Sequence, residues 1–349
     1  MIEEIYNVNF KLNGISYTKK ELLIFCKKPS KNKAVHDFII DFLSIKKTIE
    51  IKTSGSTGDS KILLMKKSIM INSAKKTGEF FNLKKEQKAL LCLPIKFIAG
   101  KMMVVRSLAL GLDLYLKKSC TNPLEKIDQN YDFTALTALQ LSNSIKHTNK
   151  VKILIVGGSP LNSRLLKEIS LSTSGVYETY GMTETVSHIA LKNLSIGEKE
   201  FNTLPGVKLL SRNKTLEINA PYISKKPIIT NDIVELISET KFVWIGRNDF
   251  VINSGGIKIN PEIIEEKLYP FYSDNFIICG SPHEKLGEQI TLVFENKIPL
   301  NYNIHFKNLG KYEVPKEIFC LKHFKYNNGK IARKYIQNLI IKIKSEKSN

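Results

Sequence analysis

Short apolar runs, each of a length that suits a β-strand, recur through the middle of the chain. They include residues 89–93, 133–138 and 152–156, and the last of these is almost continuously apolar. A run of that kind is typical of a parallel strand covered on both faces. Segments with helical periodicity alternate with these runs, such as the mostly apolar residues 98–106 before Gly111. The alternation predicts an α/β fold in which mostly parallel strands are flanked by helices.

Capping residues predict where two of the helices begin. Ser68 precedes a helical pattern and is expected to be its N-cap. A second helix is expected after the strand 152–156, with Ser159 as N-cap and Pro160 in its first turn. A third is expected over residues 139–147. The face of the first helix consists of Met70, Ala74, Thr77 and Phe81.

The pattern changes after Pro205, where alternation and turn residues predict a small antiparallel sheet that includes residues 216–219 and 232–236. A helix is expected to begin at Asn260 and Pro261, and an amphipathic helix is expected to end the chain. The apolar positions of this last helix are Ile336, Leu339, Ile340 and Ile343. A chain of 349 residues can bury a large core and is expected to divide into two domains.

The formal net charge of +20 raises the question of a nucleic-acid partner. The lysines are scattered in pairs and triplets, however, and no RNA-binding motif with interleaved aromatic residues occurs. A compositional bias toward Lys, Asn and Ile explains the charge better than a polyanionic partner does. Part of the charge can still attract anionic substrates such as nucleotides and coenzyme A.

Cysteine usage and hydropathy bear on the compartment. The five cysteines are odd in number and form no C-x-x-C pair, which favours a reducing compartment without a disulfide framework or zinc site. The acidic start of the chain lacks a signal-peptide core. The longest apolar stretch, residues 102–116, is interrupted by Arg106 and Asp113. We therefore expect a cytoplasmic protein without membrane insertion; its oligomeric state cannot be predicted.

The segment 53–61 (TSGSTGDSK) contains no large apolar side chain and lies between two predicted strands, 48–52 and 62–65. Glycines and hydroxyl groups on such a loop can wrap N–H and O–H donors around phosphate oxygens. The segment is not a Walker A loop, and taken by itself it is better explained as an ordinary hairpin turn. The residues expected to contact phosphate are Thr53, Ser54, Gly55, Ser56, Thr57, Gly58 and Lys61.

Three further motifs follow this loop: residues 180–184 (YGMTE), residues 246–249 (GRND) with the nearby Gly255 and Gly256, and residues 329–334 (GKIARK). In order and spacing, the four motifs resemble the adenylate-forming superfamily of acyl- and aryl-CoA ligases, peptide-synthetase adenylation domains and luciferases. The resemblance covers roughly residues 48–336. It implies an adenylation core over residues 1–247 and a small mobile α+β lid over residues 248–349, which turns about Asp249.

The same resemblance implies a site for ATP and Mg²⁺. Tyr180 would stack on adenine, followed by Gly181, while Thr183 would contact the α-phosphate and Glu184 would bind the metal. A Gly-Gly loop would contact the base, or else be a packing turn; it comprises Gly157, Gly158 and Ser159. Asp232 and Arg247 would hold the ribose. Lys330 would lie between the substrate carboxylate and the α-phosphate, and Gly255 and Gly256 would line the path of coenzyme A.

Within the superfamily, three features resemble a compact form of the o-succinylbenzoate–CoA ligases of menaquinone biosynthesis: the short segment before the phosphate loop, residues 98–103 and residues 187–191. The aromatic acid o-succinylbenzoate has two carboxylates, and the one that is not activated needs a cation. Lys101 or Arg106 could supply it, or either could be a surface residue whose charge reaches solvent. His188 could face the acid or be a structural histidine.

Three positions depart from the family pattern: Phe97 replaces a pocket histidine, Asn231 a glycine, and Phe324 a proline. They leave open another aryl- or acyl-CoA ligase on the same scaffold. A basic nucleic-acid-binding protein that kept a ligase fold is the alternative from a different functional class.

Overall fold

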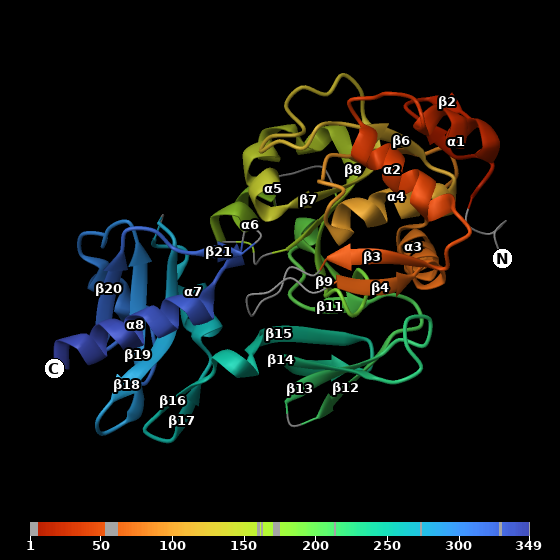
Figure 1. Ribbon diagram of the computed structural model, residues 1–349. Helices are drawn as coiled ribbons and strands as arrows, with labels where there is room; N and C mark the ends of the chain where they lie inside the picture. Colours follow the sequence, from red (N-terminus) through yellow and green to blue (C-terminus); the bar gives the residue numbers. More distant parts are fainter. Residues whose placement is uncertain are drawn as a thin grey trace.

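The computed structural model describes residues 6–52, 62–158, 161, 163–169, 175–212, 214–272, 274–327 and 330–348. Figure 1 shows two bodies: a larger one at the right, and a smaller one at the left built from the C-terminal, blue part of the chain. They are joined through the segment that follows β15. None of the helices in the described ranges is both long and apolar enough to span a membrane.

A thirteen-stranded sheet runs through the larger body. Strands β1 and β5–β9 pair in parallel, and the sheet continues beyond β9 through antiparallel strands. In spatial order the strands are β12 (Lys208–Arg212), β13 (Thr215–Asn219), β14 (Ile228–Ser238), β15 (Lys241–Arg247), β11 (Phe201–Thr203), β10 (His188–Asn193), β9 (Gly175–Gly181), β8 (Val151–Gly157), β7 (Tyr131–Thr137), β5 (Lys88–Leu91), β6 (Asp113–Leu116), β1 (Lys11–Leu12) and β2 (Ile15–Ser16).

Helices cover both faces of the parallel part, because alternate side chains of each strand enter two separate cores. On β7 and β8, Phe133 and Ile155 belong to the core that contains α3 and α4, whereas Leu136 and Leu154 pack with α5 and α6. The helices of the larger body are α1 (Lys19–Cys26), α2 (Lys33–Leu43), α3 (Lys67–Phe81), α4 (Ile98–Leu110), α5 (Ala138–Ser144) and α6 (Ser163–Ile169), with 3-10 helices η1 (Ile145–Lys150) and η2 (Leu194–Ile196).

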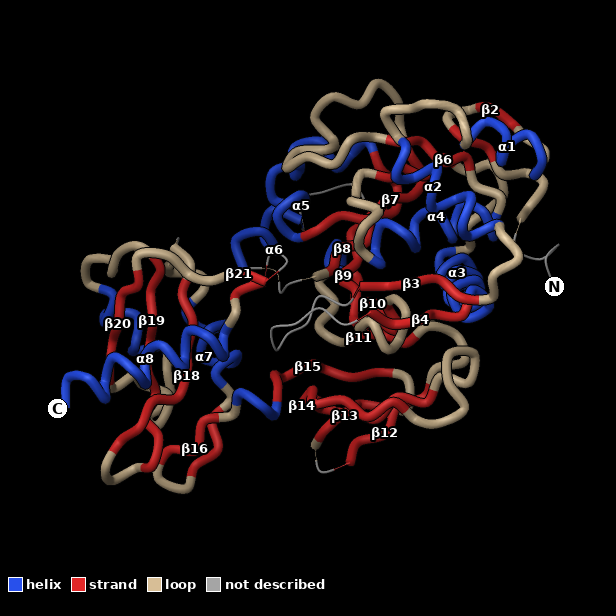
Figure 2. The backbone as a smooth tube through the Cα atoms, in the orientation of Figure 1, coloured by secondary structure: helices blue, strands red, loops and turns tan. Residues whose placement is uncertain are grey.

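The smaller body contains a five-stranded sheet in which β19 is central to β16, β18 and β20. Helices α7 and α8 lie against this sheet (Figure 2). Helix α7 packs on one face of it, and α8 packs on the other through Ile336 and Ile340. Its elements are η3 (Asn248–Phe250), β16 (Ile252–Ser254), β17 (Ile257–Ile259), α7 (Pro261–Leu268), β18 (Phe276–His283), β19 (Gly287–Glu295), η4 (Tyr302–Asn308), β20 (Glu317–Leu321), β21 (Tyr326–Asn327), β22 (Lys330–Ile331) and α8 (Arg333–Ser348).

The predicted fold class is confirmed, with parallel strands flanked by helices, antiparallel strands beside them and a smaller α+β part. The boundary between residues 247 and 248 stays a prediction. The proposed N-cap at Ser68 is wrong, because α3 already begins at Lys67, whose backbone N–H donates to the carbonyl of Lys47 at 2.9 Å.

One further helix prediction needs correction. Helix α5 ends at Ser144, and residues 145–150 continue as a 3-10 helix instead of reaching His147 as α-helix. Helix α6 is described from Ser163, whereas the predicted N-cap Ser159 and the predicted first-turn residue Pro160 lie outside the described residues.

Candidate active site

The predicted phosphate loop connects the two strands of an antiparallel hairpin, β3 (Thr48–Lys52) and β4 (Ile62–Lys66). The last described pair of this hairpin is Lys52 with Ile62. The predicted contact residues lie outside the described part of the chain, namely Thr53, Ser54, Gly55, Ser56, Thr57, Gly58 and Lys61. The flanking strands agree with the prediction, and the role of the loop itself stays a prediction.

The two glycines at the end of β8 differ in their surroundings. A Cβ on Gly157 would lie 2.3 Å from Oγ1 of Thr179, whose hydroxyl donates to the carbonyl of Val156 at 3.0 Å. Close packing therefore requires glycine at position 157. Gly158 is exposed, has a φ of 101°, and no atom lies within 4 Å of the position of a Cβ there. Of the two, only Gly158 presents backbone that a ligand could approach freely.

Tyr180 and Gly181 end strand β9, next to β8 in the sheet. The Tyr180 ring meets Phe242 edge-on at a centroid distance of 5.0 Å, and its hydroxyl donates to Asp232 at 2.6 Å. Burial and the neighbouring Asp232 carboxylate raise the pKa of Tyr180, so it is a neutral donor. A Cβ on Gly181 would lie 2.3 Å from the carbonyl oxygen of Ser187. This close approach explains why the motif needs glycine there.

Thr183 and Glu184 lie in the turn that connects β9 to β10. The carbonyl of Thr183 accepts a hydrogen bond from the N–H of Val186 at 2.9 Å, which closes the turn. Thr183 is partly exposed and Glu184 is exposed, so both can meet a ligand.

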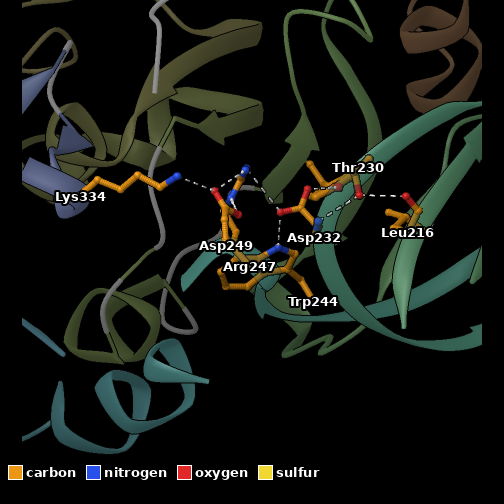
Figure 3. Close-up of polar contacts among 8 residues, drawn as sticks. Leu216, Thr230, Asp232, Trp244, Arg247, Asp249 and Lys334 are labelled. Atoms are coloured by element: carbon orange, nitrogen blue, oxygen red, sulfur yellow. Dashed lines mark hydrogen bonds and ion pairs between the residues drawn. The ribbon is translucent and has the colours of Figure 1, made fainter. Parts of the chain in front are cut away.

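Asp232 is the centre of a polar network on β14 and β15 (Figure 3). Its Oδ1 accepts from the indole N–H of Trp244 at 3.2 Å and lies 3.9 Å from Nη1 of Arg247. Arg247 also donates from Nε and Nη2 to the two carboxylate oxygens of Asp249, at 3.0 and 3.2 Å. The two predicted ribose-binding residues are therefore adjacent, and the predicted hinge residue is bound to one of them.

A second polar cluster lies beside Gly181 in the sheet. It includes His188 of β10, which is paired with Gly181 of β9 across the two strands. Arg106 of α4 is only 2% exposed, and its guanidinium meets neutral groups. Nη2 donates to Ser187 Oγ at 2.7 Å and lies 3.4 Å from His188 Nδ1, while Nε donates to Thr77 Oγ1 at 3.3 Å. No carboxylate in the described part of the chain forms an ion pair with Arg106.

His188 is held neutral within this cluster. Burial and the adjacent Arg106 lower its pKa well below the usual range. Its Nε2 lies 3.1 Å from the Thr77 hydroxyl, which itself donates to the carbonyl of Ser73. The network therefore assigns the ring proton to Nε2 and leaves Nδ1 to accept from Arg106.

Lys101 and Arg106 do not come together, although both lie on α4. The Lys101 ammonium donates to the backbone carbonyl of Glu50 on β3 at 3.0 Å and lies 5.2 Å from the centre of the Phe38 ring. Lys101 thus contacts strand β3 of the hairpin, and of these two residues Arg106 is the buried one.

The predicted coenzyme A and catalytic residues of the smaller body lie on two hairpins. Gly255 and Gly256 form the two-residue turn between β16 and β17, with φ values of 58° and 82° that favour glycine. Lys330 lies in β22, where its backbone pairs with Asn327. Its side chain lies outside the description, so the predicted position of its ammonium is untested.

Comparisons with known proteins agree with this arrangement. Residues 51–211 match the family model described as AMP-binding enzyme. A solved acyl-CoA synthetase (AMP-forming)/AMP-acid ligase II-like protein from Dyadobacter fermentans DSM 18053 is 31% identical, with a TM-score of 0.63 over 93% of this chain and 99% of that chain. The chain belongs to the AMP-binding enzyme family. The predicted class, an AMP-forming acid–CoA ligase, is confirmed.

Other relatives are more specific in name and more distant in sequence. A 2-succinylbenzoate–CoA ligase from Lactococcus lactis subsp. lactis (strain IL1403) is 25% identical over 85% of this chain and 72% of its own length. The o-succinylbenzoate CoA synthetase of Bacillus subtilis, solved with its acyl-adenylate intermediate, has a TM-score of 0.74 at 18% identity, over 94% of this chain and 78% of that one. At that identity the likeness shows the fold alone.

This AMP-binding enzyme offers few acidic ligands for a metal ion. Within the described residues, no group of three or more His, Cys, Asp or Glu side chains could hold one. Mg²⁺ is commonly bound through one or two carboxylates together with substrate phosphates and water. The single exposed carboxylate of Glu184 fits that kind of site. The Bacillus subtilis relative has also been solved in complex with ATP and magnesium ion.

Three residues of these networks were not predicted from the sequence to have a role there. Thr77 was assigned to an apolar helix face, Trp244 was given no role, and Lys334, 4.0 Å from Asp249, was named only as part of a motif. A signal existed for the first: Thr77 and Arg106 are polar residues on segments otherwise expected to be buried. Two such residues indicate a shared buried polar site.

Proposed function

We propose that the chain joins o-succinylbenzoate to coenzyme A in two steps, adenylation by ATP followed by thioester formation. The observation that carries this choice of acid is Arg106, a buried guanidinium without a carboxylate partner in the described ranges. Burying an unpaired charge is costly, and a bound anion would relieve that cost. The distant relatives named 2-succinylbenzoate–CoA ligases support the same acid.

A dicarboxylic acid suits this site because its two carboxylates have separate tasks. One is activated, and the other would pair with the fork of Arg106 donors. Ser187 adds a hydroxyl beside the fork, and neutral His188 adds no competing positive charge. The position of the cluster beside Gly181 supports a short distance between the bound acid and the Tyr180–Glu184 motif. Lys101, committed to Glu50, is the weaker choice for this role.

In the first step, a carboxylate oxygen of the acid attacks the α-phosphorus of ATP, and pyrophosphate leaves. The loop residues 53–61 would cradle the departing phosphates, and the hydroxyl of Thr183 would contact the α-phosphate. Lys330 would stabilise negative charge between the acid and the α-phosphate. Magnesium, held by Glu184, would neutralise phosphate charge when bound.

The nucleoside would lie along the ends of β8, β9, β14 and β15. Tyr180 would stack on adenine beside the Gly157–Ser159 loop, where Gly158 is the accessible backbone. Asp232 and Arg247 would bind the ribose hydroxyls. Their adjacent positions on paired strands support this assignment.

In the second step, the thiol of coenzyme A attacks the acyl carbon of the adenylate, and AMP leaves. The lid, residues 248–349, would turn about Asp249, withdrawing Lys330 and presenting the hairpin with Gly255 and Gly256. The positive φ of both glycines supports close passage of the pantetheine arm. This reaction would place the enzyme in menaquinone biosynthesis, the pathway implied by its resemblance to o-succinylbenzoate–CoA ligases.

Substrate-dependent ATP–pyrophosphate exchange tests the proposal. The panel should contain o-succinylbenzoate, its monoester at the carboxylate that is not activated, benzoate and fatty acids. We expect exchange with o-succinylbenzoate and at least a hundredfold lower efficiency with the monoester, since a buried charged partner is then lost. Equal exchange with acid and monoester would contradict the role of Arg106. More efficient exchange with another acid would contradict the proposal that o-succinylbenzoate is the substrate.

The Lys330→Ala variant separates the two steps. We expect adenylation to fall about 10²- to 10³-fold, as when a preorganised charge is removed, while thioester formation from supplied acyl-adenylate is largely retained. Lys322→Ala, an exposed lysine of the same body, is the matched control. Equal loss in both half-reactions would exclude a step-specific role for Lys330.

A further inference from the structure

Two neighbouring basic residues at the start of α8 face different partners. Arg333 is turned into the smaller body: it donates from Nη1 and Nη2 to Glu265 of α7 at 2.5 and 2.7 Å, and to the carbonyl of Ile278 on β18 at 3.0 Å. Glu265 is itself 2% exposed. Because this pair is shielded from water and bidentate, it holds α7, β18 and α8 together.

Lys334, the next residue, points toward the segment that connects the two bodies. Its Nζ lies 4.0 Å from Oδ2 of Asp249, and half of its side chain is exposed. Asp249 belongs to η3, the turn between the last strand of the large sheet and the first strand of the smaller one. Figure 3 shows Lys334 on one side of Asp249 and Arg247 on the other. Lys334 therefore connects α8 to η3, the linker between the two sheets.

Asp249 is anchored on the opposite side to the large sheet. Arg247 holds both of its carboxylate oxygens, and Arg247 in turn lies 3.9 Å from Asp232. Charges of alternating sign thus extend from Lys334 through Asp249 and Arg247 to Asp232, whose other oxygen accepts from Tyr180. The Lys334–Asp249 contact is the exposed end of this series, and the only one of its ion pairs that involves α8.

We propose that Lys334 is a positioning residue: through Asp249 it holds the C-terminal body in the orientation seen here relative to Arg247 and Asp232, and breaking this pair accompanies the change between the two half-reactions. The inference rests on the proposed function for its catalytic consequence, but not for its structural one. An exposed ion pair of this length shifts an equilibrium by no more than about fivefold, which suits a contact that must break in every turnover.

The structural test uses spin labels on Cys120 of the larger body and Cys320 of β20, the two exposed cysteines of the chain. The remaining three, Cys26, Cys92 and Cys279, are buried and need not be replaced. Distances between the labels are measured for the full-length protein, for Lys334→Gln and for the control Lys342→Gln. Lys342 lies on the same helix but pairs with Glu346, away from the linker.

We expect Lys334→Gln to change the ratio of short to long distances by about two- to fivefold, and Lys342→Gln to match the unmodified protein. High salt should move the unmodified protein toward the Lys334→Gln distribution, because the screening length falls to roughly 3 Å at 1 M. Salt should have little effect on Lys334→Gln. Identical distributions for Lys334→Gln and the unmodified protein would overturn the proposal.

The catalytic test compares the two half-reactions in the same variants. Lys334→Gln should change the ratio of adenylation rate to thioester rate by about two- to fivefold, whereas a folding defect would lower both together. An unchanged ratio would contradict the positioning role. Absence of pyrophosphate exchange in the unmodified protein would instead count against the proposed function, and the distance measurement would still decide the role of Lys334.

Discussion

Arg106 in the larger body and Arg333 in the smaller one are both withdrawn from solvent, yet they are satisfied in opposite ways. Arg333 forms a bidentate ion pair with Glu265, which raises its pKa despite burial. Among the residues that the structure describes, Arg106 meets two hydroxyls, a thioether and a neutral histidine but no carboxylate, and burial lowers its pKa to about 9. Arg333 thus has an anionic partner, and Arg106 has none among these residues.

This difference distinguishes a residue that stabilises the fold from one that we propose binds a ligand. A buried ion pair with its hydrogen bonds made is costly to break, because a single charge is left behind. A buried cation without an acid is already in that costly state. Binding and catalytic sites commonly carry such a cost in stability. Replacing a functional residue can therefore stabilise a protein.

Unfolding of two variants gives the largest contrast. Glu265→Ala leaves Arg333 without its ion-pair partner and removes the carboxylate that accepts from the Ile278 N–H at 2.6 Å. We therefore expect the free energy of unfolding to fall by about 3 kcal/mol. Arg106→Met replaces an unpaired charge with an apolar side chain of similar length, and should be neutral or stabilising. The measurement is the free energy of unfolding in urea, followed separately in each body. A larger loss for Arg106→Met than for Glu265→Ala would reverse the comparison.

Substitution of Arg106 should affect the acid and spare the nucleotide. We expect Arg106→Met to raise the KM for o-succinylbenzoate by at least thirtyfold, the range for losing one partner of a buried charge pair. Arg106→Lys should recover only part of this loss, because an ammonium cannot donate as a fork.

The KM for ATP is the internal control for these variants and should change less than threefold. If the KM for ATP rises as much as the KM for the acid, Arg106 acts on the whole site rather than on one carboxylate.

The smallest predicted effect is a pH dependence of stability that arises from Glu262, a residue of α7 whose carboxylate lies close to Arg333. Its Oε2 is buried without a hydrogen-bond partner in the described ranges, and it would lie 2.8 Å from a Cβ placed on Gly246. Burial raises the pKa of Glu262 to about 7, although Arg333 opposes the shift. Arg333 therefore has a second carboxylate nearby that it does not pair with, whereas Arg106 pairs with no carboxylate in the described part of the chain.

The sign of the pH effect follows from this raised pKa. Between its ordinary value and about 7, the folded protein binds the Glu262 proton more tightly than the unfolded chain does. Stability should therefore fall as pH rises through this window. Glu262→Gln cannot ionise and should flatten the dependence. Urea unfolding between pH 4.5 and 8 measures the dependence of the unfolding free energy on pH. If this dependence is the same in Glu262→Gln as in the unmodified protein, Glu262 is not its source.

Local patterns in the sequence predicted the elements well where one physical rule decided them. The apolar run 152–156 became β8, Gly111 ends α4 in a left-handed conformation, and Pro261 begins α7. Ser68 failed as a cap because a distant carbonyl, that of Lys47, took the role of a capping group. Such a partner is invisible to a rule that considers only neighbouring residues.

The site was less predictable, because its contacts join distant segments. Helix α4 is apolar on almost every side, so periodicity could not show whether Arg106 faced solvent or the core. The antiparallel pairing of β9 and β10 brings Ser187 and His188 to Arg106, and no local pattern encodes that register. The Lys334–Asp249 pair joins two segments whose spacing gives no hint of contact.

The topology of the large sheet has a consequence for synthesis on the ribosome. All thirteen strands, from β1 to β15, precede Asn248 in the chain, so this sheet can close while the remainder is still being translated. The nascent chain would then display the predicted adenine- and ribose-binding side chains before Lys330 has been added. The proposed nucleotide site would thus form first, and the proposed catalytic ammonium would be added last.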